Sequence, residues 1–163
     1  MLGILVFTSL SFAEIRVAFF RCFDSQGKLV EFVPGGQFCH VAIGYRGGWL
    51  HAHPVYGVEW KQGLEEIKVA KYGLTLLRKS ALSLSEKQVN PWLGVPYDPT
   101  FRWDTERATY CSKLVGKFLN ITPKIMTFET PYWKNFKNLP ENELGISPDA
   151  IYSELVRRGY DTY

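Results

Sequence analysis

The chain has 163 residues, of which 46% are hydrophobic and 21% charged, a composition that suits one globular domain with its own core. Its formal net charge of +3 comes from 19 basic and 16 acidic residues, and it contains no long basic run. This balance argues against a nucleic-acid partner. After the N-terminus, no segment is long and apolar enough for a transmembrane helix, so we expect no stable membrane insertion.

The N-terminal residues form an apolar run that is too short to span a bilayer and ends in Ser11-Phe12-Ala13, a small-x-small pattern. We interpret residues 1–13 as a signal peptide that is cleaved after Ala13. The alternative interpretation is a buried first strand. The pattern predicts an exported protein, periplasmic or extracellular, whose single domain covers residues 14–163.

The first half of the domain is rich in β-branched and aromatic residues in short runs, which is typical of strands. The runs are separated by turn residues, most clearly Asp24-Ser25-Gln26-Gly27 and Arg46-Gly47-Gly48, so two hairpins are expected. The expected strands cover residues 15–23, 29–33, 38–45, 49–54, 58–60 and 74–77. The segment at 64–69 is ambiguous.

The second half carries three helix signals. Ser83 has Glu86 at capping-box spacing, and Thr109 can cap a second helix. Ser147 can cap a third helix, with Pro148 at the first helical position. The expected helices run from 83 to the proline at 91, from 109 to 119, and from 148 to 158. The predicted fold class is therefore α+β, a mainly antiparallel sheet packed against about three helices.

All three histidines of the chain, His40, His51 and His53, lie within fourteen residues. Histidine titrates nearest neutrality, so the cluster is a candidate for proton transfer or metal binding. In a hairpin with a two-residue turn, His40 shares a face with both other histidines. If Arg46-Gly47 is the turn, His53 lies directly opposite His40 and His51 lies diagonally. A three-residue turn would place His40 on the other face.

Cys111 has two interpretations. It follows helical spacing with the apolar residues Leu114 and Val115, which is typical of a buried core cysteine. It also lies in the first turn of its helix, where unpaired N–H groups and the helix dipole lower a thiol pKa and favour the nucleophilic thiolate. A nearby imidazole would serve as its general base.

The remaining cysteines and a metal site are open alternatives. Cys22 and Cys39 could form a disulfide in an oxidising compartment, or they could be two inert buried cysteines. Zinc is the competing use of the histidines and Cys111, but His51-Ala52-His53 has no conventional partner motif. We therefore expect no metal and no cofactor.

Two sequence segments resemble a known superfamily. His40-Val41-Ala42-Ile43, a short turn, and Trp49-Leu50-His51-Ala52 resemble the histidine hairpin of circularly permuted NlpC-type, papain-like cysteine hydrolases. The segment from Pro96-Tyr97-Asp98 to Trp103, followed by Tyr110-Cys111-Ser112-Lys113-Leu114-Val115, is similar to the bacterial permuted amidase branch. Lecithin:retinol acyltransferase-like enzymes are related to it. The resemblance covers about residues 37–119.

The resemblance implies a papain-like domain with three site residues. Cys111 would be the nucleophile, His40 the base, and His51 the residue that orients the imidazole, with His53 as the alternative orienting residue. One departure is Lys113, which stands where the branch usually has glutamate. We expect that side chain to point away from the Cys111 face, towards the surface.

These observations predict an exported cysteine peptidase or amidase that cleaves an amide or ester bond through a thioester acyl-enzyme. Cell-wall peptide is the favoured substrate. A lipid acyl hydrolase or acyltransferase is one alternative, and a non-catalytic binding domain on the same fold is another. The high aromatic content, 15% of residues, would suit a substrate cleft but also a core.

Overall fold

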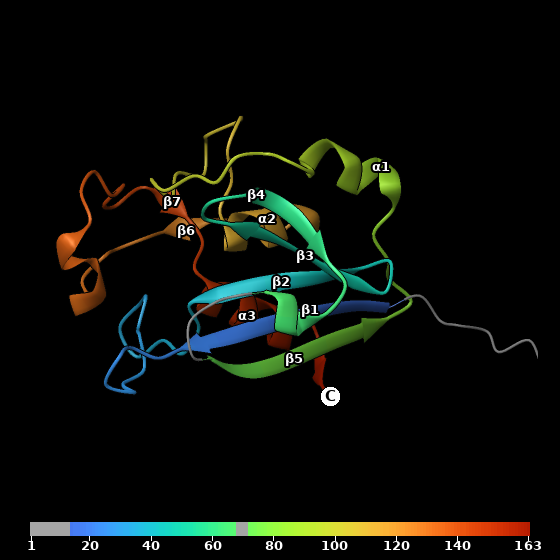
Figure 1. The fold of residues 1–163 in the computed structure, drawn as a ribbon, viewed down its shortest axis with the longest axis horizontal. Coiled ribbons are helices and arrows are strands. Elements are labelled where there is room, and N and C mark those ends of the chain that lie inside the picture. The colour runs from blue at the N-terminus through green and yellow to red at the C-terminus, as the bar shows by residue number, and fades with distance from the viewer. Residues whose placement is uncertain (1–13, 68–71) are drawn as a thin grey trace, which may run out of the picture.

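The computed structural model describes residues 14–67 and 72–163, so the predicted signal peptide lies outside the described residues. The fold is α+β, as expected, with a six-stranded sheet in the order β4-β3-β2-β1-β5-β8 (Figure 1). All neighbouring strands in this sheet are antiparallel. Its strands are β1 (Glu14–Cys22), β2 (His40–Tyr45), β3 (Gly48–His53), β4 (Gly57–Lys61), β5 (Tyr72–Ser80) and β8 (Asp161–Thr162).

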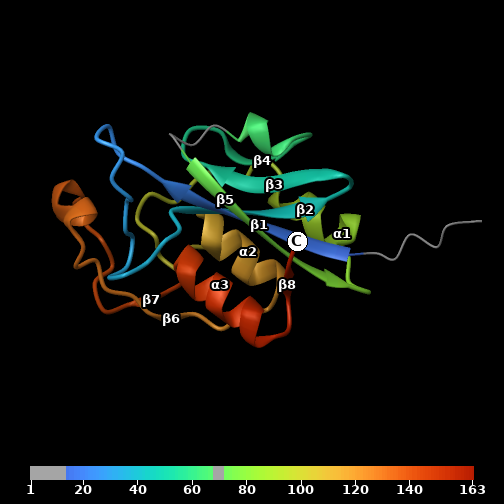
Figure 2. The same cartoon turned by 90° about the horizontal axis from the view of Figure 1, so that it is seen from below.

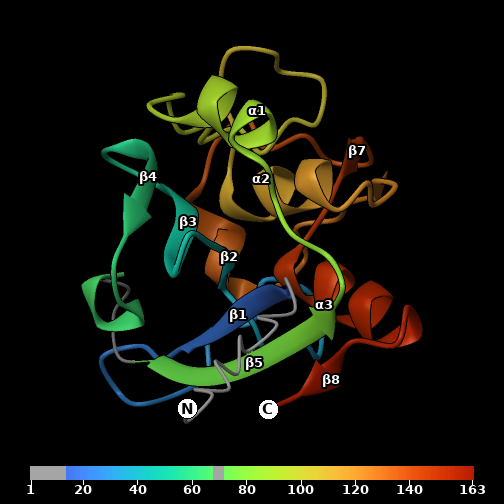
Figure 3. The same cartoon turned by 90° about the vertical axis from the view of Figure 1, so that its right-hand side faces the viewer.

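Three α-helices follow the first five strands. They are α1 (Glu86–Val89), α2 (Cys111–Phe118) and α3 (Pro148–Arg157), with 3-10 turns η1 (Leu64–Glu66), η2 (Asn90–Trp92) and η3 (Pro131–Asn135). A short second sheet pairs β6 (Lys124–Ile125) with β7 (Leu144–Gly145). Helices α2 and α3 lie together on one face of the main sheet (Figure 2), and the sheet curves around them (Figure 3).

The core has two parts because the central strand β1 is buried on both faces. Val17 and Phe19 point to the helices, where they join Leu114 in the larger hydrophobic cluster. Ala18 and Phe20 point to the opposite face and join a smaller cluster. Successive strand residues point to opposite faces, so a doubly buried strand reads as a continuous apolar run rather than an alternating one.

The predicted hairpin partner of β1 at residues 29–33 is wrong. Leu29 makes only an isolated bridge with Phe23, although the turn between them closes through the hydrogen bond from Gly27 N to Asp24 O. The neighbours of β1 are instead β2 and β5. Strand β2 occupies that edge of β1 along Val17–Phe20, so residues 29–33 reach only the end of β1, where Val30 N donates to Cys22 O at 2.9 Å.

The predicted caps of α1 and α2 are also wrong, each by one or two residues. Helix α1 is capped by Ser85, whose hydroxyl accepts from Gln88 N, and not by Ser83. The N-cap of α2 is Tyr110, because Thr109 is held in a parallel bridge with Tyr97. The cap at Ser147 and the predicted end of this helix at residue 158 are confirmed, since α3 begins at 148 and its C-cap is residue 158.

A disulfide joins Cys22, the last residue of β1, to Cys39, which directly precedes β2. The two Cα atoms are 5.7 Å apart, within the usual range for a disulfide. Of the two interpretations of these cysteines, pairing is the one that the structure contains. Within the described ranges, no helix has the length and hydropathy that crossing a membrane requires.

Candidate active site

The histidine hairpin has the two-residue turn on which the sequence argument depends. Tyr45 pairs with Gly48, which leaves Arg46 and Gly47 as the turn, with φ angles of +48° and +75°. Two successive positive φ angles define the turn type whose twist matches antiparallel strands, and glycine adopts them most easily. The predicted parity is confirmed, so His40 on β2 and His51 on β3 share a face.

The rings of His40 and His51 are in contact, and a carboxylate lies behind them. Nε2 of His40 lies 3.1 Å from Nδ1 of His51. Nε2 of His51 lies 3.1 Å from Oε1 of Glu59 on β4, although its N–H does not point straight at that oxygen. The other carboxylate oxygen, Oε2, is 3.0 Å from Nζ of Lys61. Three adjacent strands thus supply a chain of polar contacts.

This chain fixes the tautomer of each imidazole. Nε2 of His51 makes no hydrogen bond, but a lone pair there would face the Glu59 carboxylate at 3.1 Å and be repelled by it. We therefore assign the proton of His51 to Nε2, which leaves Nδ1 as an acceptor. His40 then donates from Nε2 to that acceptor. The remaining ring nitrogen of His40, Nδ1, keeps its lone pair and is therefore available as a base.

Burial keeps both histidines neutral. The pKa of His40 is lowered well below its usual value, first by burial and then by the nearby His51 and His53. The pKa of His51 is lowered to about 4, because burial outweighs the opposing effect of the Glu59 carboxylate. A neutral imidazole is the form that can accept a proton, so the pair is ready to act as base over most of the pH scale.

Glu59 was not identified from the sequence as a site residue. It stands directly opposite His51 in the β3–β4 register. The short run around Glu59 predicted a strand, but it did not indicate which strand would pair with it. Only the pairing of β4 with β3 shows that the carboxylate faces the histidine.

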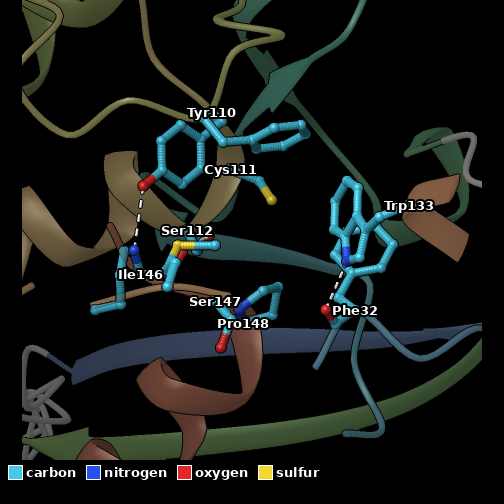
Figure 4. Close-up of a pocket in the computed structure, with 10 residues that line it drawn as sticks. Phe32, Tyr110, Cys111, Ser112, Trp133, Ile146, Ser147 and Pro148 are labelled. Atoms are coloured by element: carbon cyan, nitrogen blue, oxygen red, sulfur yellow. Dashed lines mark hydrogen bonds between the residues drawn. The ribbon is translucent and has the colours of Figure 1, made fainter. Parts of the chain in front are cut away.

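Cys111 is the first residue of α2, which packs against β2 and β3. Its side chain is 4% exposed, and the backbone N–H of Val41, the residue after His40, donates a hydrogen bond to its sulfur. In Figure 4 the sulfur projects from the start of the helix towards the side on which Trp133 lies. The nucleophile candidate therefore lies against the strand that carries the base candidate.

The expectation of a lowered thiol pKa is wrong for Cys111, because its side chain is buried. Burial raises the pKa of Cys111 to about 11, and hydrogen bonds from Val41 and from the first N–H groups of α2 offset only part of that effect. Loss of water around an anion outweighs the helix terminus here. The Cys111 thiol and the His40 imidazole are therefore both neutral at rest.

Three side chains fix the start of α2. The Ser112 hydroxyl donates to the carbonyl of Ile146 at 2.7 Å, and the Ile146 N–H donates to the Tyr110 hydroxyl at 3.2 Å. The expectation that Lys113 is a surface residue is wrong, since it is 2% exposed. Its ammonium donates to three backbone carbonyls, of residues 102, 105 and 108. It thus binds the preceding loop to the helix.

Two hollows share the aromatic side chains of Phe32 and Phe101. The smaller one, of about 10 Å³, has Cys111 itself in its wall (Figure 4). The larger pocket, of about 670 Å³, is within the range of small-molecule sites and has Phe32 and Phe101 in common with the smaller hollow. It is lined by Cys22, Phe23, Val30, Phe32, Cys39, His40, His51, His53, Pro54, Val55, Tyr97, Pro99, Phe101, Tyr132 and Phe136.

The electrostatics connect Cys111 to this larger pocket. Tyr97 and Tyr132 both line the pocket. Burial raises the pKa of each hydroxyl, and a negative charge on Cys111 raises it further. A thiolate at Cys111 would therefore raise the pKa of two tyrosines in the pocket that His40 and His51 also line.

His53 lines the same pocket but does not contact His40. Its Nδ1 accepts hydrogen bonds from the backbone N–H groups of Val55, at 3.0 Å, and Tyr56, at 3.3 Å. The contact partner of His40 is thus the diagonal neighbour His51 and not the residue directly across the hairpin. In the part of the chain that the structure describes, no group of three or more His, Cys, Asp or Glu side chains is arranged to hold a metal ion.

The chain matches no model of a protein family, and no curated protein or solved structure is significantly similar to it.

Proposed function

We propose that this protein is a thiol hydrolase that cleaves an amide or ester bond through an acyl-enzyme on Cys111. The observation that carries the proposal is the pair of close contacts from the Glu59 carboxylate to His51 and from His51 to His40, each 3.1 Å. It leaves Nδ1 of His40 as a free base on the strand against which Cys111 packs. A buried core cysteine would not require such a chain beside it.

The reaction would proceed in two halves. Nδ1 of His40 takes the thiol proton of Cys111 as the sulfur attacks the carbonyl carbon, which forms the S–C bond and a tetrahedral oxyanion. N–H groups at the start of α2 would stabilise that oxyanion. Collapse breaks the bond to the leaving group, which takes the proton from His40. A water molecule, deprotonated by His40, then hydrolyses the thioester and releases the acid and the free thiol.

The neutral resting pair is compatible with this route. Because burial raises the pKa of Cys111 and lowers that of His40, charge separation is unfavourable until a substrate is bound. Proton transfer would then accompany attack, with the charge passing to the carbonyl oxygen. His51 and Glu59 would stabilise the imidazolium of His40 while it exists.

The order of elements supports a circularly permuted papain-like arrangement, in which the histidine strands precede the nucleophile helix. Strands β2 and β3 precede α2, and α2 packs on both. The alternative of a non-catalytic binding domain has less support, because such a domain needs neither a free base nor a cysteine next to it.

The pocket lining favours an acyl group without charges over cell-wall peptide. None of the described residues that line the larger pocket is Asp, Glu, Lys or Arg. A peptide stem with free carboxylates or amines would lose water there without gaining a counter-charge. Six aromatic side chains line the pocket instead, from Phe23, Phe32, Tyr97, Phe101, Tyr132 and Phe136. The favoured substrate class is therefore a neutral ester or amide of an apolar acid.

The test is covalent labelling by p-nitrophenyl octanoate, followed by intact-mass and peptide mass spectrometry. The protein should gain one octanoyl group on Cys111. The Cys111→Ala variant should gain none, and Arg157→Ala, on the exposed side of α3, should label as the parent does. A γ-glutamyl dipeptide ester with a free carboxylate should label far more slowly. Undiminished labelling of Cys111→Ala would refute the nucleophile assignment.

A further inference from the structure

The hydrogen bonds of His53 leave one of its ring nitrogens free for a ligand. Two backbone N–H groups, of Val55 and Tyr56, donate to Nδ1, so that atom is an acceptor and carries no proton. The proton of the neutral ring is therefore on Nε2, on the opposite side of the imidazole. Within residues 14–67 and 72–163, no hydrogen bond to Nε2 is found.

The ring is also held in place. It stacks on Tyr56 with ring centroids 4.7 Å apart and an angle of 24°. Its two hydrogen bonds to the turn fix its rotation, so Nε2–H is a donor in one position rather than a mobile group. His53 is half-buried and belongs to the lining of the larger pocket.

The other polar side chains of the pocket differ from His53 in their surroundings. Nε2 of His40 is paired with Nδ1 of His51, and Nε2 of His51 lies 3.1 Å from the Glu59 carboxylate. For the hydroxyls of Tyr97 and Tyr132, burial and then a charge on Cys111 raise the pKa. The hydrogen-bond donors and the stacked ring next to His53 belong to the turn between β3 and β4, and its other ring neighbour is His51, with centroids 6.0 Å apart.

We propose that His53 is a substrate-binding residue whose Nε2–H donates a hydrogen bond to an uncharged oxygen of the ligand in the larger pocket. The ligand class is a neutral, mainly apolar molecule with a carbonyl, ester or amide oxygen. A pocket without charged side chains accepts such a molecule, and a single fixed donor sets its orientation. The inference rests on the proposed function only in treating this pocket as the substrate site.

The test measures binding without turnover, in the Cys111→Ala background. The probes are butyrophenone and 2-phenyl-1-pentene, which differ only in C=O against C=CH2. His53→Asn keeps an acceptor for the Val55 and Tyr56 N–H groups but removes the distal donor. It should weaken butyrophenone binding about 2-fold to 10-fold, the range of one hydrogen bond, and leave alkene binding unchanged. His53→Gln, whose amide reaches the position of Nε2, should restore part of the difference.

A purely structural role for His53 would weaken both probes equally, because the two molecules have the same shape. An unchanged ratio of ketone to alkene affinity in both variants would therefore overturn the proposal. The result is separable from the proposed function. Lost labelling of Cys111 with an intact His53 effect would contradict the hydrolase alone, and intact labelling without a His53 effect would contradict this inference alone.

Discussion

The larger pocket has two facing walls that are built in different ways. One is the sheet wall, formed by β2 and β3, where His40, His51 and His53 take their positions from strand register. The other is the loop wall, formed by residues 23–38 and 126–136. There the indole N–H of Trp133 donates to the carbonyl of Phe32 at 2.7 Å, and the Thr130 hydroxyl donates to Glu31 O at 2.6 Å.

The difference is one of sequence distance. The sheet wall joins residues 11 apart, as in the His40–His51 contact. The contacts of the loop wall join residues 99 and 101 apart. In the sheet wall, a tight turn sets the register between neighbouring strands. The loop wall instead forms only when two segments that are far apart in the sequence, 23–38 and 126–136, have come together. We therefore expect substitutions in the sheet wall to lower the rate of the reaction, and substitutions in the loop wall to disrupt the pocket itself.

The largest effect is expected from His40→Ala on the sheet wall. Loss of the base should lower the rate of ester turnover about 10²-fold to 10⁴-fold, the usual contribution of general acid–base catalysis. Steady-state kinetics with p-nitrophenyl octanoate measure it, and Gln26→Ala in an exposed turn is the matched control. A turnover rate within about threefold of the parent would exclude His40 as the base.

Trp133→Ala should have the largest effect on the loop wall. The side chain is buried, lies against Phe32, Phe101, Phe128, Tyr132 and Phe136, and donates a hydrogen bond. Its truncation should cost about 3–5 kcal/mol of unfolding free energy if the two walls unfold together. If the loop wall opens by itself, hydrogen exchange will accelerate in residues 23–38 and stay slow in β2 and β3. Equal acceleration in both walls would contradict their independence.

Acid should weaken the sheet wall through its neutral histidines. The pKa of His51 is about 4 in the folded protein against an ordinary 6.5. The unfolded chain therefore binds more protons between these values, and stability falls as pH drops through this window. The loss from His51 alone is on the order of 3 kcal/mol between pH 7 and pH 4. Urea unfolding at several pH values measures it, and His51→Gln should have a shallower slope. An identical slope in both proteins would contradict the assignment.

The smallest of these effects is expected from Glu59→Gln. An amide can donate as well as accept, so it no longer requires the His51 proton to be on Nε2. We expect turnover to fall about 10-fold to 100-fold with little change in stability. The ¹⁵N shifts of the imidazoles of His51 and His40 should then report mixed tautomers. Lys61→Ala, which leaves the carboxylate in place, should cost less. Unaltered imidazole shifts would show that Glu59 does not set the tautomer.

Sequence reasoning was most reliable where a local rule decides the outcome. The Arg46-Gly47 turn, the shared face of His40 and His51, and the cap at Ser147 all depend on a few consecutive residues. It failed for most of residues 29–33, which have strand composition but pair only at the end of β1, because β2 and β5 occupy both edges along Val17–Phe20. Strand propensity is a property of one segment, whereas pairing depends on which other strand lies against the edge of β1.

The candidate site divides in the same way. The shared face of His40 and His51 and the place of Cys111 near a helix start could be predicted from parity and spacing, but the protonation state of the thiol could not. A helix N-terminus by itself lowers a thiol pKa, and only the burial of Cys111 in the fold reverses the sign. The buried ammonium of Lys113 is a similar case, because its three carbonyl partners are a loop that the sequence pattern does not place.

The sequence by itself determined the α+β class, the histidine hairpin with its turn, and the placement of Cys111 at the start of a helix, because each follows from contacts between near neighbours in the chain. Only the tertiary structure decided that Glu59 lies next to His51, that Nδ1 of His53 accepts hydrogen bonds from the backbone, and that an aromatic pocket without charged side chains is lined by His40 and His51. Burial and long-range pairing set these features, and both depend on the whole folded chain rather than on any one segment.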